Sequence, residues 1–302
     1  MQCPICSKST GVLIEDYEKY RIYHCLFCGV DFSDPMESAT PDFYQNQDVY
    51  SIRNFLVSAD SLTFGHKQFF RDMPLINSEL LDIGCGVGTF LSKANNEGYQ
   101  VVGIDFNKDL IDFGKEYFNL ENMFNISIEK FLNKNPLYKF KVITFFEVLE
   151  HLADPPKFIG QIKKFLLPDG YIALSVPNRK RTFAPVIFEK NDIQPNHLTW
   201  WDKSSLEFFL NTNGFIIERI TDDFDENSML TILNEKIRFG LMKNKLQNLD
   251  LNNLNYEEIQ NIRKLSLTKQ IMLTYISKIA APLYKLFNTK GLWIYALARL
   301  IT

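Results

Sequence analysis

The middle of the chain alternates short apolar runs with stretches in which apolar residues recur at helical spacing. The apolar runs have the length of strands and lie near residues 79–83, 100–104, 124–128, 140–146, 170–176 and 214–221. The stretches with helical spacing lie near residues 89–97, 107–117, 154–167 and 202–212. Strands that alternate with helices in this way form a parallel sheet covered by helices on both faces. The pattern therefore predicts an α/β core over residues 78–227.

The pattern changes on both sides of this core. Residues 35–77 begin as a linker and continue as an aromatic, helix-compatible segment that we expect to cap the core. Residues 228–290 look helical but do not fit the alternation, so they predict a helical insertion. The apolar run at 291–302 predicts a final antiparallel strand that completes a seven-stranded sheet, with a terminal helix as the alternative.

A glycine-rich turn follows the first strand of the core. Glycine occupies positions 84, 86 and 88, and a helix is expected to open at Thr89. Glycines at such a turn let the backbone approach a bound cofactor closely. The next strand ends at Asp105, where a carboxylate can accept hydrogen bonds from both hydroxyls of a ribose. The two features together predict a cofactor that contains a nucleoside.

The spacing of the turn argues against a dinucleotide. The dinucleotide fingerprint places its third small residue five positions after the first glycine, where this chain has Thr89, and here the glycine comes one position earlier. Asp82 precedes the turn, and a carboxylate there repels phosphate and favours a cationic ligand. S-adenosylmethionine has no phosphate and carries a sulfonium and an ammonium group. The turn therefore favours S-adenosylmethionine.

Five segments in a fixed order carry a resemblance to a known family. They are LDIGCGVG at 81–88, VGID at 102–105, FFEVLEHLADP at 145–155, LLPDGY at 166–171 and SVPN at 175–178. The chain resembles class I S-adenosylmethionine-dependent methyltransferases from about residue 40 to 224. The resemblance implies a Rossmann-like sheet of seven strands, mostly parallel with the last antiparallel. The family often has Phe-Asp-x-Ile at the fourth strand, where this chain has Lys141 after Phe140, which we interpret as a surface change.

The resemblance also implies a set of cofactor contacts. Gly84, Gly86 and Glu147 are expected near the methionine portion and Asp105 at the ribose, with residues 127–129 beside the adenine. The full set of expected cofactor residues is Asp82, Gly84, Cys85, Gly86, Gly88, Asp105, Phe106, Ser127, Ile128, Glu129, Phe146 and Glu147. Within this set, Cys85 fits best as a small buried residue.

Four of the five cysteines form two pairs near the N-terminus. Cys3 and Cys6 form one pair and Cys25 and Cys28 the other, which is the spacing of a zinc site. Short alternating runs between the pairs are typical of small strands, so residues 1–34 predict a zinc ribbon. Four thiolates leave no open coordination position, so the Zn²⁺ is expected to be structural. The alternatives are disulfides, which a cytosolic protein disfavours, and a redox pair, which lacks its usual βαβ context.

Charge and hydropathy restrict the partners. The net charge is −3, and residues 1–40 hold three basic against six acidic side chains, so nucleic-acid binding is not expected. The chain shows neither an apolar run after Met1 nor about twenty consecutive apolar residues, which predicts a cytoplasmic protein. Residues 261–302 contain seven basic side chains and no acidic one. The amphipathic stretch at 271–287 is therefore expected to lie on a membrane surface, on the core or on a second subunit.

Two histidines are candidate catalytic residues. His151 follows the fourth core strand, and His197 lies in the loop after the fifth, so both are expected at the carboxyl edge of the sheet where ligands bind. A hydroxyl acceptor needs a group that removes its proton during in-line methyl transfer. The alternatives are a loop-shaping hydrogen bond for His151 and acceptor binding for His197. Trp200, Trp201 and Phe183 either line the acceptor pocket or belong to the core.

The expected reaction is therefore O-methylation of a small molecule or saccharide. The two cysteine pairs, the VDFSDP segment at 30–35 and the tyrosine-rich stretch that follows resemble methyltransferases of surface-polysaccharide and natural-product pathways. One alternative is an RNA methyltransferase in which the zinc ribbon reads the RNA. The other is a non-catalytic binding protein with this fold, against which the intact glycine turn and Asp105 argue.

Overall fold

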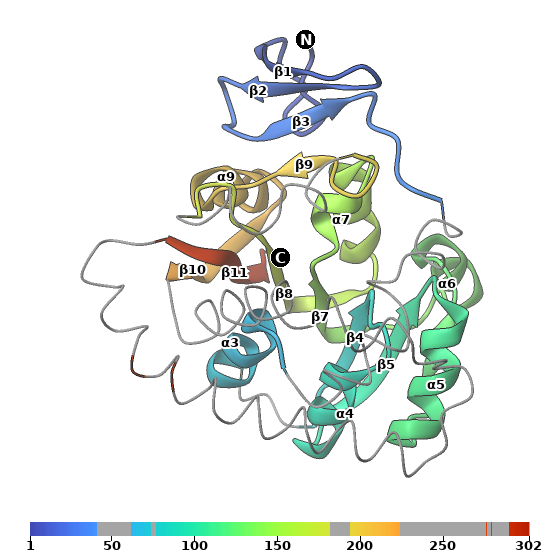
Figure 1. Cartoon of the computed structure of the whole chain (residues 1–302). Helices are drawn as coiled ribbons and strands as arrows, with labels where there is room; N and C mark the ends of the chain where they lie inside the picture. Colours follow the sequence, from blue (N-terminus) through green and yellow to red (C-terminus); the bar gives the residue numbers. More distant parts are fainter. Residues whose placement is uncertain are drawn as a thin grey trace.

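The computed structural model describes residues 1–40, 62–73, 77–181, 194–223, 276, 279 and 290–301. Its main sheet has seven strands in the order β10-β11-β8-β7-β4-β5-β6. They are β4 (Glu79–Ile83), β5 (Gln100–Asp105), β6 (Met123–Asn125), β7 (Phe140–Phe146), β8 (Leu166–Pro177), β10 (Phe215–Asp223) and β11 (Lys290–Leu300). The strands from β4 to β8 pair in parallel, and β11 is antiparallel to both of its neighbours. This confirms the predicted Rossmann-like fold and its antiparallel last strand (Figure 1).

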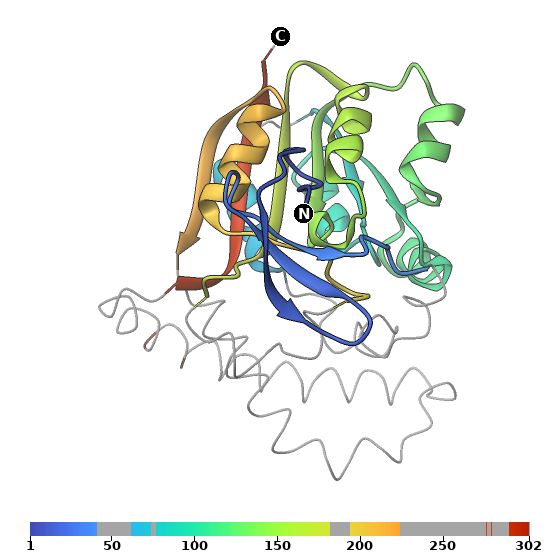
Figure 2. The same ribbon diagram turned by 90° about the horizontal axis from the view of Figure 1, so that it is seen from above.

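Helices lie on both faces of this sheet. They are α3 (Phe64–Asp72), α4 (Thr89–Asn96), α5 (Lys108–Phe118), α6 (Ile128–Lys134), α7 (Pro155–Lys163) and α9 (Lys203–Thr212), together with the 3₁₀ turn η2 (Leu149–His151). Figure 2 shows α7 and α9 in front of the sheet and α3 behind it. Asp154 caps α7 by accepting a hydrogen bond from the Lys157 N–H at 3.0 Å, and Pro155 is the first residue of the helix, where its missing N–H is not needed.

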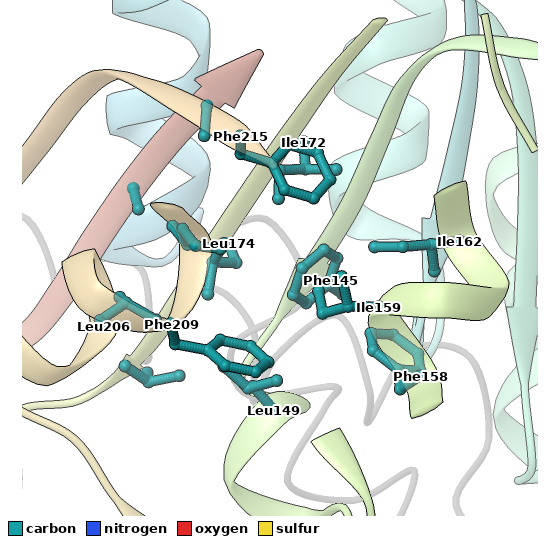
Figure 3. Close-up of a cluster of buried hydrophobic side chains, with 14 of the residues drawn as sticks. Phe145, Leu149, Phe158, Ile159, Ile162, Ile172, Leu174, Leu206, Phe209 and Phe215 are labelled. Atoms are coloured by element: carbon teal, nitrogen blue, oxygen red, sulfur yellow. The ribbon is translucent and has the colours of Figure 1, made fainter. Parts of the chain in front are cut away.

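The two hydrophobic cores follow from the alternation of side chains along the strands. In β7, Ile143 and Phe145 belong to the cluster that α7 and α9 cover, whereas Val142 and Phe146 belong to the cluster on the opposite face. Figure 3 shows the first cluster, in which Phe145 lies among side chains of α7 and α9. Because successive side chains of a strand point to opposite faces, a buried strand with both faces covered reads as a continuous apolar run.

The strand β11 decides between the two structures predicted for residues 291–302, a final strand or a terminal helix. It lies between β8 and β10, and most of its side chains are buried. A strand buried on both faces is apolar throughout, which explains the apolar run in the sequence. The alternative of a terminal helix was wrong. The predicted insertion at 228–290 and the amphipathic stretch at 271–287 lie outside the described residues, apart from Lys290 and the exposed Ile276 and Ile279. None of the described helices has the length and apolar character that crossing a membrane requires.

The strand predicted at 124–128 was too long at its end. β6 stops at Asn125, and α6, which the pattern did not predict, begins at Ile128. Ser127 causes the change, because its side chain accepts a hydrogen bond from the Lys130 N–H at 3.2 Å and so caps the new helix.

The boundary between α7 and β8 along the chain also differs from the prediction. α7 ends at Lys163, and β8 starts at Leu166, earlier than predicted. Its pairing with β7 jumps from Leu166 to Tyr171, so the residues between them bulge outward with Asp169 in a left-handed conformation (φ 54°). Lys141 supports this bulge, because its Nζ donates to the Asp169 carbonyl at 2.9 Å.

A second, four-stranded sheet joins the N-terminal segment to the core. It consists of β1 (Gly11–Asp16), β2 (Arg21–Cys25), β3 (Asp31–Asp34) and β9 (Thr199–Trp200), in that order. The first two strands lie where short strands were predicted, and β3 and β9 were not predicted. The short strand β9 comes from the core and pairs antiparallel with β3, so the two sheets meet at this point (Figure 1).

Candidate active site

The glycine turn leaves open space where a ligand can reach the backbone. Gly84, Gly86 and Gly88 all have positive φ, at +75°, +54° and +82°. A Cβ on Gly84 would lie 2.6 Å from Val148 Cγ2, whereas a Cβ on Gly86 would meet nothing within 4 Å. The Gly84 N–H donates to the Ile104 carbonyl at 2.9 Å, which ties the turn to β5. The turn is therefore held on one side and open at Gly86, which fits a cofactor that contacts the backbone.

Asp105 lies at the tip of β5 and is aimed at this turn. Its Oδ2 accepts the Gly86 N–H at 2.9 Å, and its Oδ1 accepts the Asn107 N–H at 2.8 Å. Burial raises the pKa of this carboxyl, and the hydrogen bonds from Asn107 and Gly86 oppose the rise. Because a carboxylate can accept about four hydrogen bonds, Asp105 retains acceptor capacity for the hydroxyls of a ribose.

Asp82 is a buried carboxyl beside the same turn. Its side chain is 3% exposed, and Thr144 Oγ1 donates to its Oδ1 at 2.6 Å. Burial raises the pKa of Asp82 to about 8, and the nearby Asp105 adds to the rise while Thr144 opposes it. A cationic ligand at this position stabilises the ionised carboxyl, so the arrangement fits a sulfonium or ammonium group.

Glu147 is the third buried carboxyl at this edge of the sheet. It follows β7 in a left-handed conformation with φ 56°. The Glu147 N–H donates to the Ser175 carbonyl at 2.9 Å, and Ser175 Oγ donates to Glu147 Oε1 at 2.6 Å. Burial raises the pKa of Glu147 to about 7. A non-glycine residue held in this conformation by its neighbours is often found at a functional site.

The structure also places the remaining predicted cofactor residues. Cys85 is buried, and its Sγ would lie 2.8 Å from a Cβ added to Gly103, so it packs closely against β5 as a small residue. Phe106 is 54% exposed next to Asp105, and Phe146 is buried. Ser127 caps α6, Ile128 is buried within it, and Glu129 accepts a hydrogen bond from Gln161 at 3.1 Å. Phe146 ends β7, and the others follow the carboxyl ends of β4, β5 and β6, the edge where ligands bind in such sheets.

The structure brings His151 and His197 together. Their ring centroids are 4.8 Å apart, edge to face, and His151 Nδ1 lies 2.6 Å from the Asn196 carbonyl oxygen. The carbonyl can only accept, so Nδ1 carries the proton and Nε2 carries the lone pair. Burial lowers the pKa of His151 to about 4. The pKa of His197 lies well below its usual value, mainly because of burial and to a smaller extent because of the neighbouring His151 and Arg181. Both imidazoles are therefore neutral at pH 7.

Glu150 lies beside these histidines and was not singled out from the sequence. It is 1% exposed, its Oε1 is 3.7 Å from His151 Nε2, and neither of its carboxyl oxygens has a hydrogen-bond partner among the described residues. Ligand atoms of Glu150, His151 and His197 lie within 4.8 Å of one another, a set that can hold a metal ion. In the sequence, Glu150 lies between Glu147 and His151, which were both predicted as site residues. That position could have drawn attention to Glu150, but nothing in the local sequence indicated its burial.

The structure decides the position of one of the two tryptophans after His197. Trp201 is fully buried, donates from Nε1 to Thr199 Oγ1 at 2.9 Å, and packs against Phe209 with ring centroids 5.2 Å apart. It therefore belongs to the core. Trp200 is half-buried on β9, and Phe183 lies outside the described residues.

The four N-terminal cysteines form a compact cluster. The sulfurs of Cys3 and Cys28 are 3.7 Å apart, and those of Cys6 and Cys25 are 3.6 Å apart. None of the four is in a disulfide, so the disulfide alternative is wrong for this structure. Four thiolates that bind Zn²⁺ tetrahedrally at about 2.3 Å have sulfurs roughly 3.8 Å apart. The cluster therefore fits a zinc ion.

Comparison with known proteins identifies the family. Residues 57–220 match the methyltransferase domain family. The ubiquinone biosynthesis O-methyltransferase of Haemophilus ducreyi is 31% identical over 175 residues, which is 50% of this chain and 73% of that protein. The protein of the same name from Coxiella burnetii is 26% identical over 179 residues, 53% of this chain and 76% of that protein. The chain belongs to the methyltransferase domain family.

Solved structures share the fold of this methyltransferase. Haemonchus contortus phosphoethanolamine N-methyltransferase 2, in complex with S-adenosyl-L-methionine, aligns with a TM-score of 0.56 at 14% identity over 96% of this chain and 71% of that one. Coclaurine N-methyltransferase aligns with a TM-score of 0.51 at 13% identity over 85% and 76% of the two chains. Together with the family match and the curated relatives, the site geometry makes this chain an S-adenosylmethionine-dependent methyltransferase.

Proposed function

We propose that the methyltransferase methylates an oxygen atom of a small hydroxylated molecule or a saccharide. The observation that carries this proposal is the pair of neutral imidazoles at the carboxyl edge of the sheet, with His197 buried and His151 half-buried. The curated relatives support oxygen as the acceptor atom, because their names describe O-methyltransferases. The saccharide rests on the resemblance of the N-terminal segment to polysaccharide-pathway methyltransferases.

The glycine turn and three nearby carboxyls hold the cofactor. Gly86 offers its backbone, Asp105 accepts hydrogen bonds from the ribose hydroxyls, and the carboxyls of Asp82 and Glu147 favour the cationic methionine portion. When bound, S-adenosylmethionine supplies an electrophilic methyl group on a sulfonium.

His197 is the proposed proton acceptor, with His151 beside it. A neutral imidazole can take the hydroxyl proton while the acceptor oxygen forms its bond to the methyl carbon. His151 cannot rotate freely, because its Nδ1–H is held by the Asn196 carbonyl. The His197 residue is only 7% exposed, which limits its contact with water.

We also propose that the four cysteines bind one structural Zn²⁺ and that residues 1–40 do not read nucleic acid. Four sulfur ligands fill a tetrahedral shell. The excess of acidic side chains in this segment opposes binding to phosphates.

The test separates cofactor binding from chemistry with two variants. Asp105→Ala removes the ribose acceptor, so the affinity for S-adenosylmethionine measured by calorimetry should fall by about 100-fold or more. His197→Ala should leave that affinity unchanged and lower turnover by about 100-fold or more. Turnover is followed with radiolabelled methyl donor on a panel of phenols, saccharides and RNA, and the product is identified by mass spectrometry.

Two results contradict the proposal. Wild-type turnover by His197→Ala would exclude this residue as the proton acceptor. Labelling of RNA in preference to phenols and saccharides would favour the RNA methyltransferase instead.

A further inference from the structure

The N-terminal segment contacts the loop of His197 at two points. The Ser33 N–H of β3 donates a hydrogen bond to the Leu198 carbonyl at 2.9 Å. Shortly after β3, the Pro35 carbonyl accepts a hydrogen bond from Gln194 Nε2 at 3.0 Å. Figure 1 shows β3 beside β9, the short strand that follows this loop. The two bonds lie on either side of His197 in the sequence, so they hold the loop before and after this residue.

Ser38 connects the same N-terminal segment to the turn that carries His151. Its Oγ donates to the His151 carbonyl at 3.1 Å and accepts a hydrogen bond from the Ala153 N–H at 3.0 Å. One hydroxyl therefore satisfies an acceptor and a donor of the backbone where the 3₁₀ turn η2 ends. This turn contains only three residues, and so short a turn has few hydrogen bonds of its own. The orientation of His151 at its end therefore depends on this contact from outside the turn.

The turn of His151 and the loop of His197 are bonded to each other. The Nδ1–H of His151 donates to the Asn196 carbonyl at 2.6 Å, and the Leu198 N–H donates to the Glu150 carbonyl at 2.8 Å. The two imidazole rings pack with centroids 4.8 Å apart. A shift of the turn is therefore transmitted to the loop and changes the ring against which His197 packs.

The attachment of the N-terminal segment to the core does not depend on Ser38. The pairing of β3 with β9 and the ion pairs of Arg179 with Asp31 and Asp202 join the two parts elsewhere. Ser38 itself is exposed, and hydrogen bonds of an exposed hydroxyl contribute only modestly to stability. Loss of this hydroxyl should therefore leave the fold intact. Its contacts place it at the backbone of His151 rather than among the groups that hold the segment in place.

We propose that Ser38 is a positioning residue for methyl transfer, which aligns His151 and through it His197. Ser38 precedes residues 57–220, which match the methyltransferase domain family, so the N-terminal segment adds this contact from outside the matched domain. The inference rests on the proposed function of His197 as proton acceptor. Displacement of an aligned group lowers the rate of the chemical step, whereas it leaves contacts with the bound cofactor in place.

The first measurement follows the imidazole of His151 by NMR in the full chain with isotopically labelled histidine, without cofactor or acceptor. In wild type the Nδ1–H is held by the Asn196 carbonyl and should exchange slowly with water. Ser38→Ala should raise this exchange rate by about 10-fold, because the turn opens more often. Ser38→Thr keeps the hydroxyl and should restore the slow exchange. Ser9→Ala, at another exposed serine of the segment, is the matched control and should exchange like wild type.

The second measurement separates positioning from binding and from stability. With a hydroxylated acceptor from the panel of phenols and saccharides, Ser38→Ala should lower kcat by about 10-fold. Its KM for the acceptor, its affinity for S-adenosylmethionine and its midpoint of thermal unfolding should stay close to those of wild type. Ser38→Thr should regain the kcat of wild type. A purely structural role would instead lower the midpoint of unfolding of Ser38→Ala and leave kcat of the folded protein unchanged.

The exchange measurement decides the proposal without any acceptor. Equal exchange rates of the Nδ1–H in wild type and Ser38→Ala would overturn it, as would equal kcat values of the two proteins. Failure of the proposed function gives a different result, in which His197→Ala turns over like wild type. Faster exchange in Ser38→Ala would then still support the alignment of His151 by Ser38, and only the role of His197 would be lost.

Discussion

Asp82 lies in β4 and its carboxyl is buried. Burial raises the pKa of this carboxyl to about 8. The sequence indicated a cationic ligand from the position of this residue ahead of the glycine turn. The structure adds that its partner is the hydroxyl of Thr144, a contact between β4 and β7 that no local pattern indicates. In the free protein the carboxyl keeps its proton at neutral pH, whereas the unfolded chain loses it near pH 4.

This difference predicts how stability depends on pH. Between about pH 4 in the unfolded chain and about 8 in the folded one, the folded protein binds a proton that the unfolded chain has released. Unfolding then releases a proton, so the free energy of unfolding falls as pH rises through this window, by at most about 1.4 kcal/mol per pH unit from this group.

Urea unfolding at pH 5, 6.5 and 8 without cofactor tests the prediction on wild type and Asp82→Asn. Glu147 has a raised pKa of about 7 and contributes in the same direction, so the variant should lose only part of the slope. An identical slope in both proteins would exclude Asp82 as a contributor.

At the scale of elements, the turn between β4 and α4 needs glycine at positions 84 and 86 for two different reasons. Gly84 and Gly86 both have positive φ, but only Gly84 lies where a side chain would collide with a neighbouring element, at Val148 Cγ2. The sequence predicted the turn and could not separate these roles, because the collision involves Val148, which directly precedes η2, and the open space depends on the edge of the sheet.

Alanine substitution at the two positions should separate packing from ligand access. Gly86→Ala should cost about 1–2 kcal/mol of stability from its left-handed backbone alone. Gly84→Ala should cost about 1–3 kcal/mol more, because the added methyl collides with Val148. Gly86→Ala should nevertheless weaken cofactor affinity, because its methyl enters the open space. Denaturant unfolding and calorimetry measure the two effects, and equal stability losses would contradict the assignment.

At the scale of the whole molecule, the cysteine-rich segment is joined to the part of the core that carries the histidines. β3 pairs with β9 shortly after His197, and Ser38 donates to the His151 carbonyl at 3.1 Å. Arg179 crosses the same interface, where it forms an ion pair with Asp31 of β3 and another with Asp202 of the core at 2.9 Å. The segment is therefore a part of the scaffold around His151 and His197.

Removing Arg179 should loosen this connection. Arg179→Met leaves His24 as the remaining partner of Asp31 and breaks the link from Asp31 to the core. We therefore expect faster release of zinc from the cysteine cluster to a chelating dye, by a factor of several. Lys180→Met is the matched control, because Lys180 pairs with Asp202 at 2.7 Å and is more exposed. Its zinc release should stay close to that of wild type. Equal release rates in the two variants would show that the Arg179 contact does not hold the segment.

The sequence by itself determined the features that depend on near neighbours in the chain. Strand and helix periods, the glycine turn, Asp105 at a strand end and the spacing of the cysteines are local patterns, and each predicts its structure through backbone geometry. The boundary at Ser127 was missed because capping competes with strand formation over a single residue.

Only the tertiary structure decided which distant side chains meet and which lose their contact with water. The cluster of Glu150, His151 and His197, the burial of Trp201 and the pairing of β9 with β3 all depend on packing between segments far apart in the chain. Burial and long-range contact set the pKa of a carboxyl or imidazole and its fitness as a ligand. The pKa of a side chain and its fitness as a ligand therefore depend on its folded surroundings, and the type of a residue and its spacing in the sequence do not specify those surroundings.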